Sequence, residues 1–157
     1  MRLSVRTSSN MKKILLFALT VILSVQTFAQ VTASFDFIVS VKGDYPFSGS
    51  GSAVVQDTRY YVRTSGLEIF CDGNTRWMVD TTAEEVTVET AEDWMDMVAS
   101  YDLRYDGSKV SGALIKLTDG SEVSIAVSDF TESIPTSTKF SLDVSTLPDS
   151  YIVTDLR

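Results

Sequence analysis

The side chains that usually perform covalent chemistry are sparse in this chain and lack partners that would activate them. The 157 residues include no histidine and a single cysteine, Cys71. A serine–histidine nucleophile and a histidine-ligated zinc site are therefore excluded. Ser48, Ser50 and Ser52 have no candidate base, and Gly49-Ser-Gly51 lacks the lysine that follows in a phosphate loop. We interpret Cys71 as a buried apolar residue of a strand, since nothing in the sequence would activate its thiol.

Pairs of carboxylates are the second group with chemical potential. Glu84 and Glu85 are adjacent, and Asp93 and Asp96 are close in sequence. No acidic stretch has the alternate-position spacing of a calcium loop, and a glycosidase needs two carboxylates facing each other across a cleft. We interpret these acids as solvated charge, and the Asp-Gly pairs as turns. The sequence thus predicts no catalytic residue, no metal site and no cofactor, so we expect a protein that is not an enzyme.

The segment from Leu67 to Asp80 carries the clearest signal for binding. It is typical of two strands joined at Asp72-Gly73, a pair that supplies the positive φ of a tight hairpin turn. Apolar residues occupy both faces of both strands, interrupted by only a few charged residues. A hairpin that is apolar on both sides must be covered twice, or it must present one face to an apolar ligand.

Strand patterns dominate the rest of the chain. Residues 31–41 alternate between apolar and mostly polar side chains, which is the period of a strand. The stretch 43–51 is rich in turn-forming residues, and Asp-Gly pairs mark two later hairpin turns. Further strands are predicted at 52–56, 59–64, 85–89, 101–105, 113–117, 123–127, 139–144 and 151–156.

One short helix is predicted, from Ala91 to about Ala99. Thr90 can cap it, and the acids of its first turn favour the positive end of a helix. Its apolar stripe consists of Trp94, Met95, Met97 and Val98. Together these elements predict a mainly β (α+β) fold, in which a strongly curved antiparallel sheet forms an incomplete, half-open β-barrel with one short covering helix.

The first 29 residues have the features of a secretory signal peptide. Four basic residues precede an apolar run from Ile14 to Val25, and Ala29 is a small residue before the expected cleavage. The run is shorter than the roughly 20 residues of a membrane span. No cysteine lies near position 30 to carry a lipid. We therefore expect residues 1–29 to be removed and residues 30–157 to form a single domain without a lipid anchor.

The chain after Ala29 is strongly acidic. Nine basic residues stand against 21 acidic ones there, a net charge of −12. Such a chain is repelled by phosphate backbones and by anionic lipid surfaces. Nucleic acid is therefore not an expected partner.

Several short motifs occur in an order that resembles one known family. Gly49-Ser-Gly51 leads into a strand, Cys71-Asp-Gly-Asn-Thr-Arg-Trp77 forms the hairpin, and Glu85-Val-Thr-Val88 follows. The chain ends with Lys139-Phe-Ser-Leu-Asp, Pro148 and Tyr151 to Arg157. This order resembles the LolA-like periplasmic carriers of outer-membrane lipoproteins, and especially their short Bacteroidetes-type members. The Asp-Gly-x-Thr-x-Trp hairpin is the most specific of these motifs.

The resemblance implies a soluble periplasmic carrier, or chaperone, whose apolar concave face holds the acyl chains of a lipoprotein or a similar lipid-like cargo. It implies an inner-membrane release complex that supplies the cargo and an outer-membrane acceptor that receives it. We expect a monomer that undergoes no covalent chemistry. The alternative is a non-transporting sensor module that binds lipid or protein on the same fold.

The site needed for such cargo is a water-free apolar surface. Each buried CH₂ contributes about 0.8 kcal/mol, and aromatic residues and methionines give adaptable contacts without fixed hydrogen bonds. The same residue types also build ordinary protein cores, so periodicity alone leaves both interpretations open. The expected lining residues are Phe35, Phe37, Trp77, Val79, Val86, Val88, Trp94, Met95 and Met97.

Two features of the chain depart from the family. Longer carriers begin with a helix that packs into the concave face, whereas a strand pattern here begins almost directly after the expected cleavage. The carriers also place an Arg-Pro pair after the second strand, and that arginine helps to hold the lid closed. The matching positions here are Asp57-Thr58, with Arg59 and Arg63 as the nearest substitutes.

Overall fold

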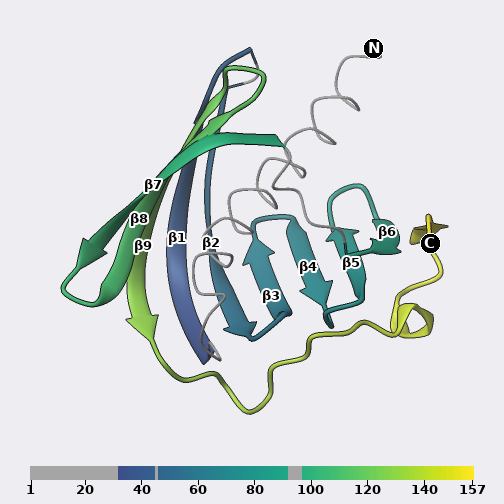
Figure 1. The fold of residues 1–157 in the computed structure, drawn as a ribbon. Helices are drawn as coiled ribbons and strands as arrows, with labels where there is room; N and C mark the ends of the chain where they lie inside the picture. The colour runs from purple at the N-terminus through teal and green to yellow at the C-terminus, as the bar shows by residue number, and fades with distance from the viewer. Residues whose placement is uncertain (1–31, 45, 92–96) are drawn as a thin grey trace. The chain divides into compact units, whose positions relative to one another are not determined.

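The computed structural model describes residues 32–44, 46–91 and 97–157, and these residues are mainly β (Figure 1). Within them, the one named helix is a short 3-10 helix, η2 (Val144–Thr146). The strands are β1 (Thr32–Lys42), β2 (Phe47–Gln56), β3 (Arg59–Thr64), β4 (Leu67–Cys71), β5 (Thr75–Asp80), β6 (Glu85–Thr90), β7 (Val98–Asp106), β8 (Lys109–Leu117), β9 (Glu122–Thr131) and β10 (Ile152–Asp155).

The described strands belong to one open sheet with the order β10-β6-β5-β4-β3-β2-β1-β9-β8-β7. Each hairpin pair from β2 to β6, and from β7 to β9, is antiparallel. Strand β10 is different, because it pairs parallel with β6, with Ile152 opposite Glu85. The prediction of a mainly β protein with one large sheet is confirmed, whereas the prediction of a purely antiparallel sheet is wrong at β10.

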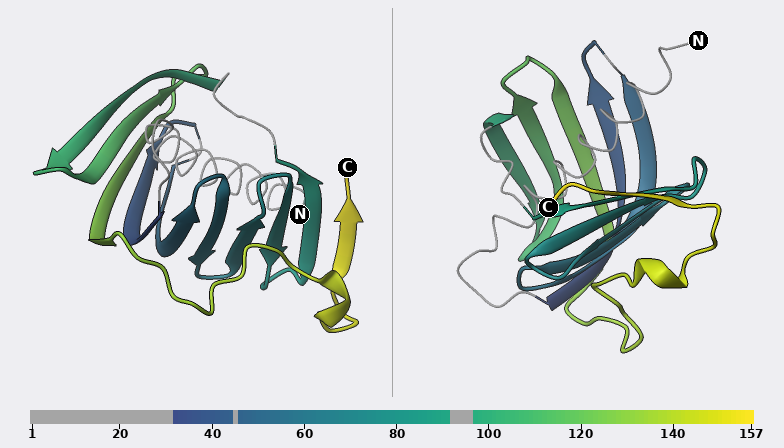
Figure 2. Two further views of the ribbon diagram at one scale, coloured as in Figure 1. Left: turned by 60° about the horizontal axis from the view of Figure 1, so that its bottom comes forward. Right: turned by 90° about the vertical axis from the view of Figure 1, so that its right-hand side faces the viewer.

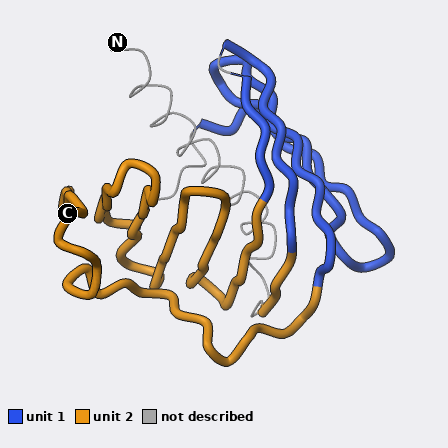
Figure 3. The backbone as a smooth tube through the Cα atoms, turned by 180° about the vertical axis from the view of Figure 1, so that it is seen from behind, with its two compact units in different colours: residues 1–29, 36–50, 93–130 blue, residues 30–35, 51–92, 131–157 orange. Residues whose placement is uncertain are grey.

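The chain divides into two compact units, which Figure 3 shows in different colours. Of the described residues, unit 1 contains 36–44, 46–50 and 97–130. Unit 2 contains 32–35, 51–91 and 131–157.

Unit 1 is built around the β7-β8-β9 meander. Alternate residues of β8 and β9 face its core, and the register places Ile115 opposite Val123 and Ala113 opposite Ile125. All four side chains are buried. Gly112 permits the close approach of β8 to β9, because a Cβ at this position would lie 2.6 Å from the carbonyl oxygen of Ile125. The absence of a side chain is therefore a packing requirement at this glycine.

Unit 2 is a meander of β3 to β6 together with the second half of β2. The predicted hairpin is confirmed, since β4 and β5 are joined through Asp72, Gly73 and Asn74. Oδ1 of Asp72 accepts hydrogen bonds from the backbone N–H groups of Asn74 (2.9 Å) and Thr75 (2.8 Å). Gly73 has φ +99°, which an L side chain rarely adopts. The Asp-Gly pair thus acts as a turn, with the aspartate oxygen closing it.

The C-terminal part of unit 2 crosses the meander before it joins the sheet. Residues 139–151, which we call the strap, lead past the ends of β3, β4 and β5 to η2, and β10 then lies beside β6 (Figures 1 and 2). The predicted strand at 139–144 is wrong. Asp143 caps η2, with its side chain accepting from the N–H of Ser145 at 3.0 Å. Leu142 and Val144 pack against the sheet instead of pairing with it.

Two other predicted elements differ from the structure. The predicted helix at 91–99 is not confirmed: residues 92–96, with Trp94 and Met95, lie outside the described residues, and Val98 and Ala99 belong to β7. Strand β2 begins at Phe47, inside the stretch predicted as turn. Gly49 and Gly51 weaken the strand pattern here, which is why the sequence favoured a turn. The predicted signal peptide, residues 1–29, also lies outside the described residues.

Candidate functional site

The β2-to-β6 part of unit 2 has two faces, which the strand register defines. Residues opposite each other in paired strands project to the same side of a sheet, and successive residues project to opposite sides. Face one carries Ala53, Val62, Ile69, Met78 and Thr87 as one row across five strands. Face two carries the row Val54, Tyr61, Phe70, Trp77 and Val88.

Face one is the more completely apolar of the two over β2, β3 and β4. Ile69 is 0% exposed and Val62 is 1% exposed. Six residues of this face are buried and apolar, namely Ala53, Val55, Val62, Leu67, Ile69 and Cys71. The face is thus a contiguous hydrocarbon surface, because these residues occupy neighbouring positions on three adjacent strands.

A polar row borders this surface on face one. It consists of Tyr60, Arg76 and Glu89, and the apolar Cys71 lies between Tyr60 and Arg76 in the register across β3, β4, β5 and β6. Arg76 is 2% exposed, and its Nε and Nη2 donate to Oε1 of Glu89 at 2.8 Å and 2.5 Å. A buried guanidinium is costly unless it is paired, so Glu89 is the charge that makes this position tolerable.

The pKa shifts in this row follow from burial and from Arg76. Burial raises the pKa of Tyr60, with only partial opposition from Arg76, so the phenol is neutral at pH 7. Burial alone would lower the pKa of Arg76, but the interactions with Tyr60 and Glu89 raise it above its usual value. Since Tyr60 is neutral at pH 7, Glu89 supplies the counter-charge there. Burial also raises the pKa of the Cys71 thiol, which makes it a poor nucleophile.

Face two is covered by the strap. Val79, Val86 and Val88 are 3%, 1% and 3% exposed, and they form a buried cluster. Phe70 and Trp77 from the sheet pack against this cluster, as do four strap residues: Leu142, Val144, Leu147 and Tyr151. The chain therefore fills this side of the hairpin with its own side chains.

Arg59 and Tyr61 make further contacts on face two. The guanidinium carbon of Arg59 lies 5.0 Å from the centroid of the Phe140 ring, and Arg59 also donates to Oε1 of Gln56. Tyr61 donates its hydroxyl to Oε1 of Glu68 at 2.5 Å, and its ring lies 4.9 Å from that of Phe70. Burial, followed by this hydrogen bond, raises the pKa of Tyr61 to about 12.

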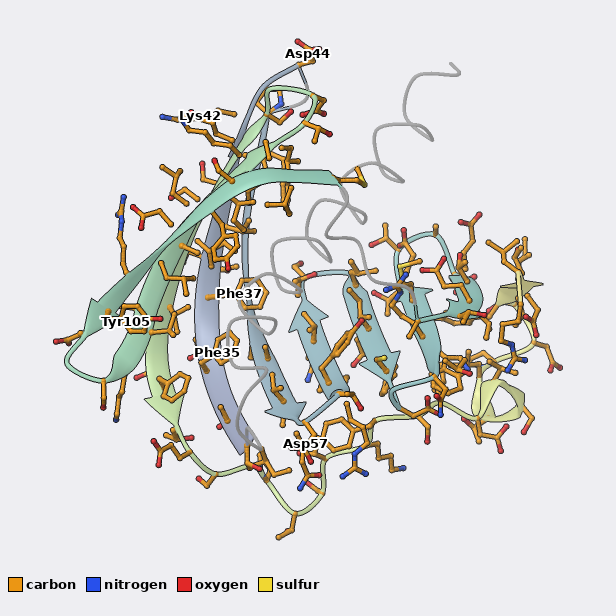
Figure 4. The ribbon with its side chains drawn as sticks, viewed as in Figure 1. Phe35, Phe37, Lys42, Asp44, Asp57 and Tyr105 are labelled. Atoms are coloured by element: carbon orange, nitrogen blue, oxygen red, sulfur yellow. The ribbon has the colours of Figure 1, made fainter. Side chains whose placement is uncertain are left out.

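Asp57 and Thr58, which the sequence comparison aligned with the Arg-Pro pair of the LolA-like carriers, form a two-residue turn between β2 and β3. Asp57 has φ +56° there, and Figure 4 labels its side chain. Of the two nearest arginines, Arg59 is the one placed against the strap, through Phe140.

The structure brings four of the nine predicted lining residues together. Trp77 and the three valines, Val79, Val86 and Val88, lie on face two beneath the strap. Phe35 and Phe37 project from the same side of β1 and are 4% and 2% exposed (Figure 4). Phe35 belongs to unit 2 and Phe37 to unit 1. Met97 is 42% exposed.

Sequence reasoning missed the buried apolar rows of face one and the pairing of Arg76 with Glu89. The alternation Leu67, Ile69, Cys71 was available as a signal, and it continues in register to Val62 and Ala53 on the neighbouring strands. In the sequence, Arg76 is a charged residue that interrupts the apolar pattern of the hairpin. Its pairing with Glu89 depends on the β5-β6 register, which the sequence does not state.

Other kinds of site are not found in the described part of the chain. No group of three or more histidine, cysteine or carboxylate residues suited to a metal ion occurs among the described residues. None of the described segments forms a helix with the length and apolar character needed to span a bilayer. In comparisons with known proteins, neither a protein-family model nor a curated protein matches this chain.

Proposed function

We propose that this protein is a LolA-like periplasmic carrier that binds the acyl chains of lipoproteins, or of a similar lipid-like cargo, on face one of unit 2. In this proposal the sheet curves into a half-open barrel with face one on its concave side. The signal peptide directs the chain to the periplasm and is removed there. Cargo passes from an inner-membrane release complex to an outer-membrane acceptor.

The observation that supports the proposal is a difference between the two faces of the hairpin: the strap packs on one of them only. Both are apolar, but the strap of the chain itself packs on face two. Face one bears a contiguous, buried apolar surface over β2, β3 and β4, bordered on β5 by two charged residues, Arg76 opposite Cys71 and Asp80 opposite Leu67. Hydrocarbon chains have no polar atoms along their length, so they require a surface of this kind.

This proposal moves part of the predicted site. Trp77, Val79, Val86 and Val88 contact the strap, so acyl chains would reach them only if the strap moved away. Ile69, Val62 and Leu67 replace them as the expected contacts of the cargo, and since these three are only 0%, 1% and 8% exposed, the cargo must displace the groups that bury them. Phe35 and Phe37 stay in the prediction as lining residues of β1.

The test uses matched valine-to-threonine variants, which keep the shape and strand preference of the side chain and replace one methyl group by a hydroxyl. Val62 lies on face one, and Val54, on the adjacent strand, lies on face two. A fluorescent fatty-acid analogue should bind the protein, and Val62→Thr should weaken that binding about tenfold, because a hydroxyl buried against hydrocarbon costs about 1–3 kcal/mol. Val54→Thr should bind normally. Absence of binding by the unmodified protein, or equal loss in both variants, would contradict the proposal.

Native mass spectrometry separates the carrier from the alternative sensor. Protein purified from a periplasmic extract should retain acylated cargo if it is a carrier. Protein that is consistently empty, and yet binds the fatty-acid analogue, would favour a non-transporting binding module.

A further inference from the structure

Strand β7 has one edge that is unpaired among the described strands. It stands at the end of the strand order, and among the described strands it pairs only with β8. One register shift falls before Ser100, and the other places an extra residue, Ser111, on β8 and not on β7. From Ser100 to Asp106 the backbone of β7 therefore continues without an inserted residue. Such an edge presents N–H and C=O groups to which another strand can pair.

The side chains of β7 are those of an interface rather than of a core. Tyr101 and Tyr105 are 47% and 56% exposed, and Figure 4 labels Tyr105 on β7. Their partners in β8, Ile115 and Val110, are buried on the same face. Exposed tyrosines that extend a buried apolar face are enriched in protein–protein interfaces, because they bury a large area with little loss of conformational freedom.

We propose that β7 pairs in antiparallel fashion with β7 of a second copy of this chain, about a two-fold axis at Leu103. This register places Asp102 opposite Arg104 of the partner subunit, and Arg104 opposite Asp102 of the partner subunit. It also places Tyr101 opposite Tyr105 of the partner subunit. Directly opposed charges of opposite sign and directly opposed aromatic residues both stabilise antiparallel pairs. Since Leu103 is the midpoint of Ser100–Asp106, the whole regular stretch takes part.

The charge pattern distinguishes this register from its neighbours. Moving the axis to Asp102 would bring two aspartates face to face, and moving it to Arg104 would do the same with two arginines. An axis between residues would place the tyrosine face of one strand beside the charged face of the other. Edge strands usually use charge to repel other strands, but alternation of sign makes this edge complementary to itself.

The dimer should be weak. Both copies carry a net negative charge, so long-range repulsion opposes association. Pairing along one strand edge also buries an area at the small end of the range for specific interfaces. The expected dissociation constant is therefore roughly micromolar or weaker. The monomer expected from the sequence would then be the species at high dilution.

Sedimentation velocity over a concentration series up to millimolar protein tests the pairing. The unmodified protein should shift from monomer to dimer. Asp102→Arg and Arg104→Asp should each raise the dissociation constant of the dimer at least tenfold, because each places like charges opposite each other. The double variant D102R/R104D should regain it, and an equimolar mixture of the two single variants should form the heterodimer. Lys139→Asp changes the charge as Arg104→Asp does but lies in the strap, and should dimerise normally.

A cysteine test fixes the register independently. Residues directly opposite each other have Cα atoms about 4.5–5.5 Å apart, which a disulfide can span. Leu103→Cys should therefore form an intermolecular disulfide in air, while native Cys71 is buried and does not compete. Tyr105→Cys should not, because two copies of residue 105 would be about 13 Å apart along the strands. A protein that stays monomeric to millimolar concentration overturns the proposal. Equal cross-linking by both cysteine variants, or no rescue by the double charge variant, also overturns it.

Discussion

Arg76 and Glu89 are cross-strand partners whose side chains share one oxygen: Nε and Nη2 of the arginine both donate to Oε1 of the glutamate, at 2.8 Å and 2.5 Å. The guanidinium is buried, whereas the side chain of Glu89 is 21% exposed. The pair therefore ties β5 to β6 at the border of the apolar surface of face one. It also keeps a buried charge compensated.

Removal of Glu89 alone should destabilise the protein. Glu89→Met leaves the guanidinium without this carboxylate, and breaking a buried pair in this way costs about 3 kcal/mol. The double variant R76M/E89M removes both charges and should be less destabilised than E89M. Urea unfolding monitored by circular dichroism measures both changes. As a control, Glu122→Met breaks the exposed Lys116–Glu122 pair, 3.9 Å apart, and should cost under about 1 kcal/mol. A double variant less stable than E89M would contradict this account of the pair.

The stability of the protein should fall above about pH 10. Tyr61 has its pKa raised from 10.0 to about 12, mainly by burial, and burial also raises the pKa of Tyr60. The unfolded chain therefore releases these phenolic protons at lower pH than the folded chain does. Between about pH 10 and pH 12 the unfolded state binds fewer protons, so increasing pH favours unfolding. Urea midpoints at pH 8 and pH 11 should show the loss. Tyr61→Phe should reduce it, and an unchanged pH dependence in both Y60F and Y61F would refute the assignment.

Gly112→Ala should weaken unit 1. Its Cβ would meet the backbone oxygen of Ile125 at 2.6 Å, and a backbone atom cannot rotate away as a side chain can. Forcing the two strands apart costs about 1–3 kcal/mol. Gly107→Ala is the comparison, since Gly107 has φ +62° but no atom within 4 Å of an added Cβ. Gly107→Ala therefore tests backbone strain without crowding, and this strain should cost about 1 kcal/mol. Thermal unfolding should rank Gly112→Ala as the more damaging, and the reverse order would show that β8 and β9 can separate at little cost.

A charge in the strap should expose face two. Leu142 packs on the cluster of Val79, Val86 and Val88. Leu142→Asp should cost about 2 kcal/mol and increase the fluorescence of a dye that binds apolar surfaces. Ser141→Asp adds the same charge at the exposed neighbouring position and should stay within about 0.5 kcal/mol of the unmodified protein. If both variants behave alike, the strap does not seal the cluster.

Most of the sheet could be predicted from the sequence, because its signals are local. Alternation in residues 31–41 predicts β1, and Asp72-Gly73 predicts the β4-β5 hairpin; the structure confirms both. The strap could not be predicted in this way. Lys139 to Val144 has the composition of a strand, but its apolar side chains pack on face two of the sheet. That choice depends on contacts with β5 and β6, far away in the sequence, and no local pattern encodes them.

The candidate site likewise combines local features that the sequence predicts with long-range contacts that it does not. The apolar character of the hairpin is visible in its sequence, and Leu67, Ile69 and Cys71 are buried as alternation requires. Which face the chain covers with the strap could not be predicted, because Trp77 and Val79 pack with strap residues that are distant in the sequence. The ligand-lining role of Phe35 and Phe37 stays a prediction.

The parallel pairing of β10 with β6 has a consequence for how the chain matures. Strand β10 completes the edge of the sheet at β6, and the strap that precedes it completes the buried cluster on face two. Contacts between such distant parts of a chain form late, since a long loop must close first. Until then the β4-β5 hairpin has no cover on one side. Unit 2 should therefore reach its final fold only after the strap and β10 have docked on the meander.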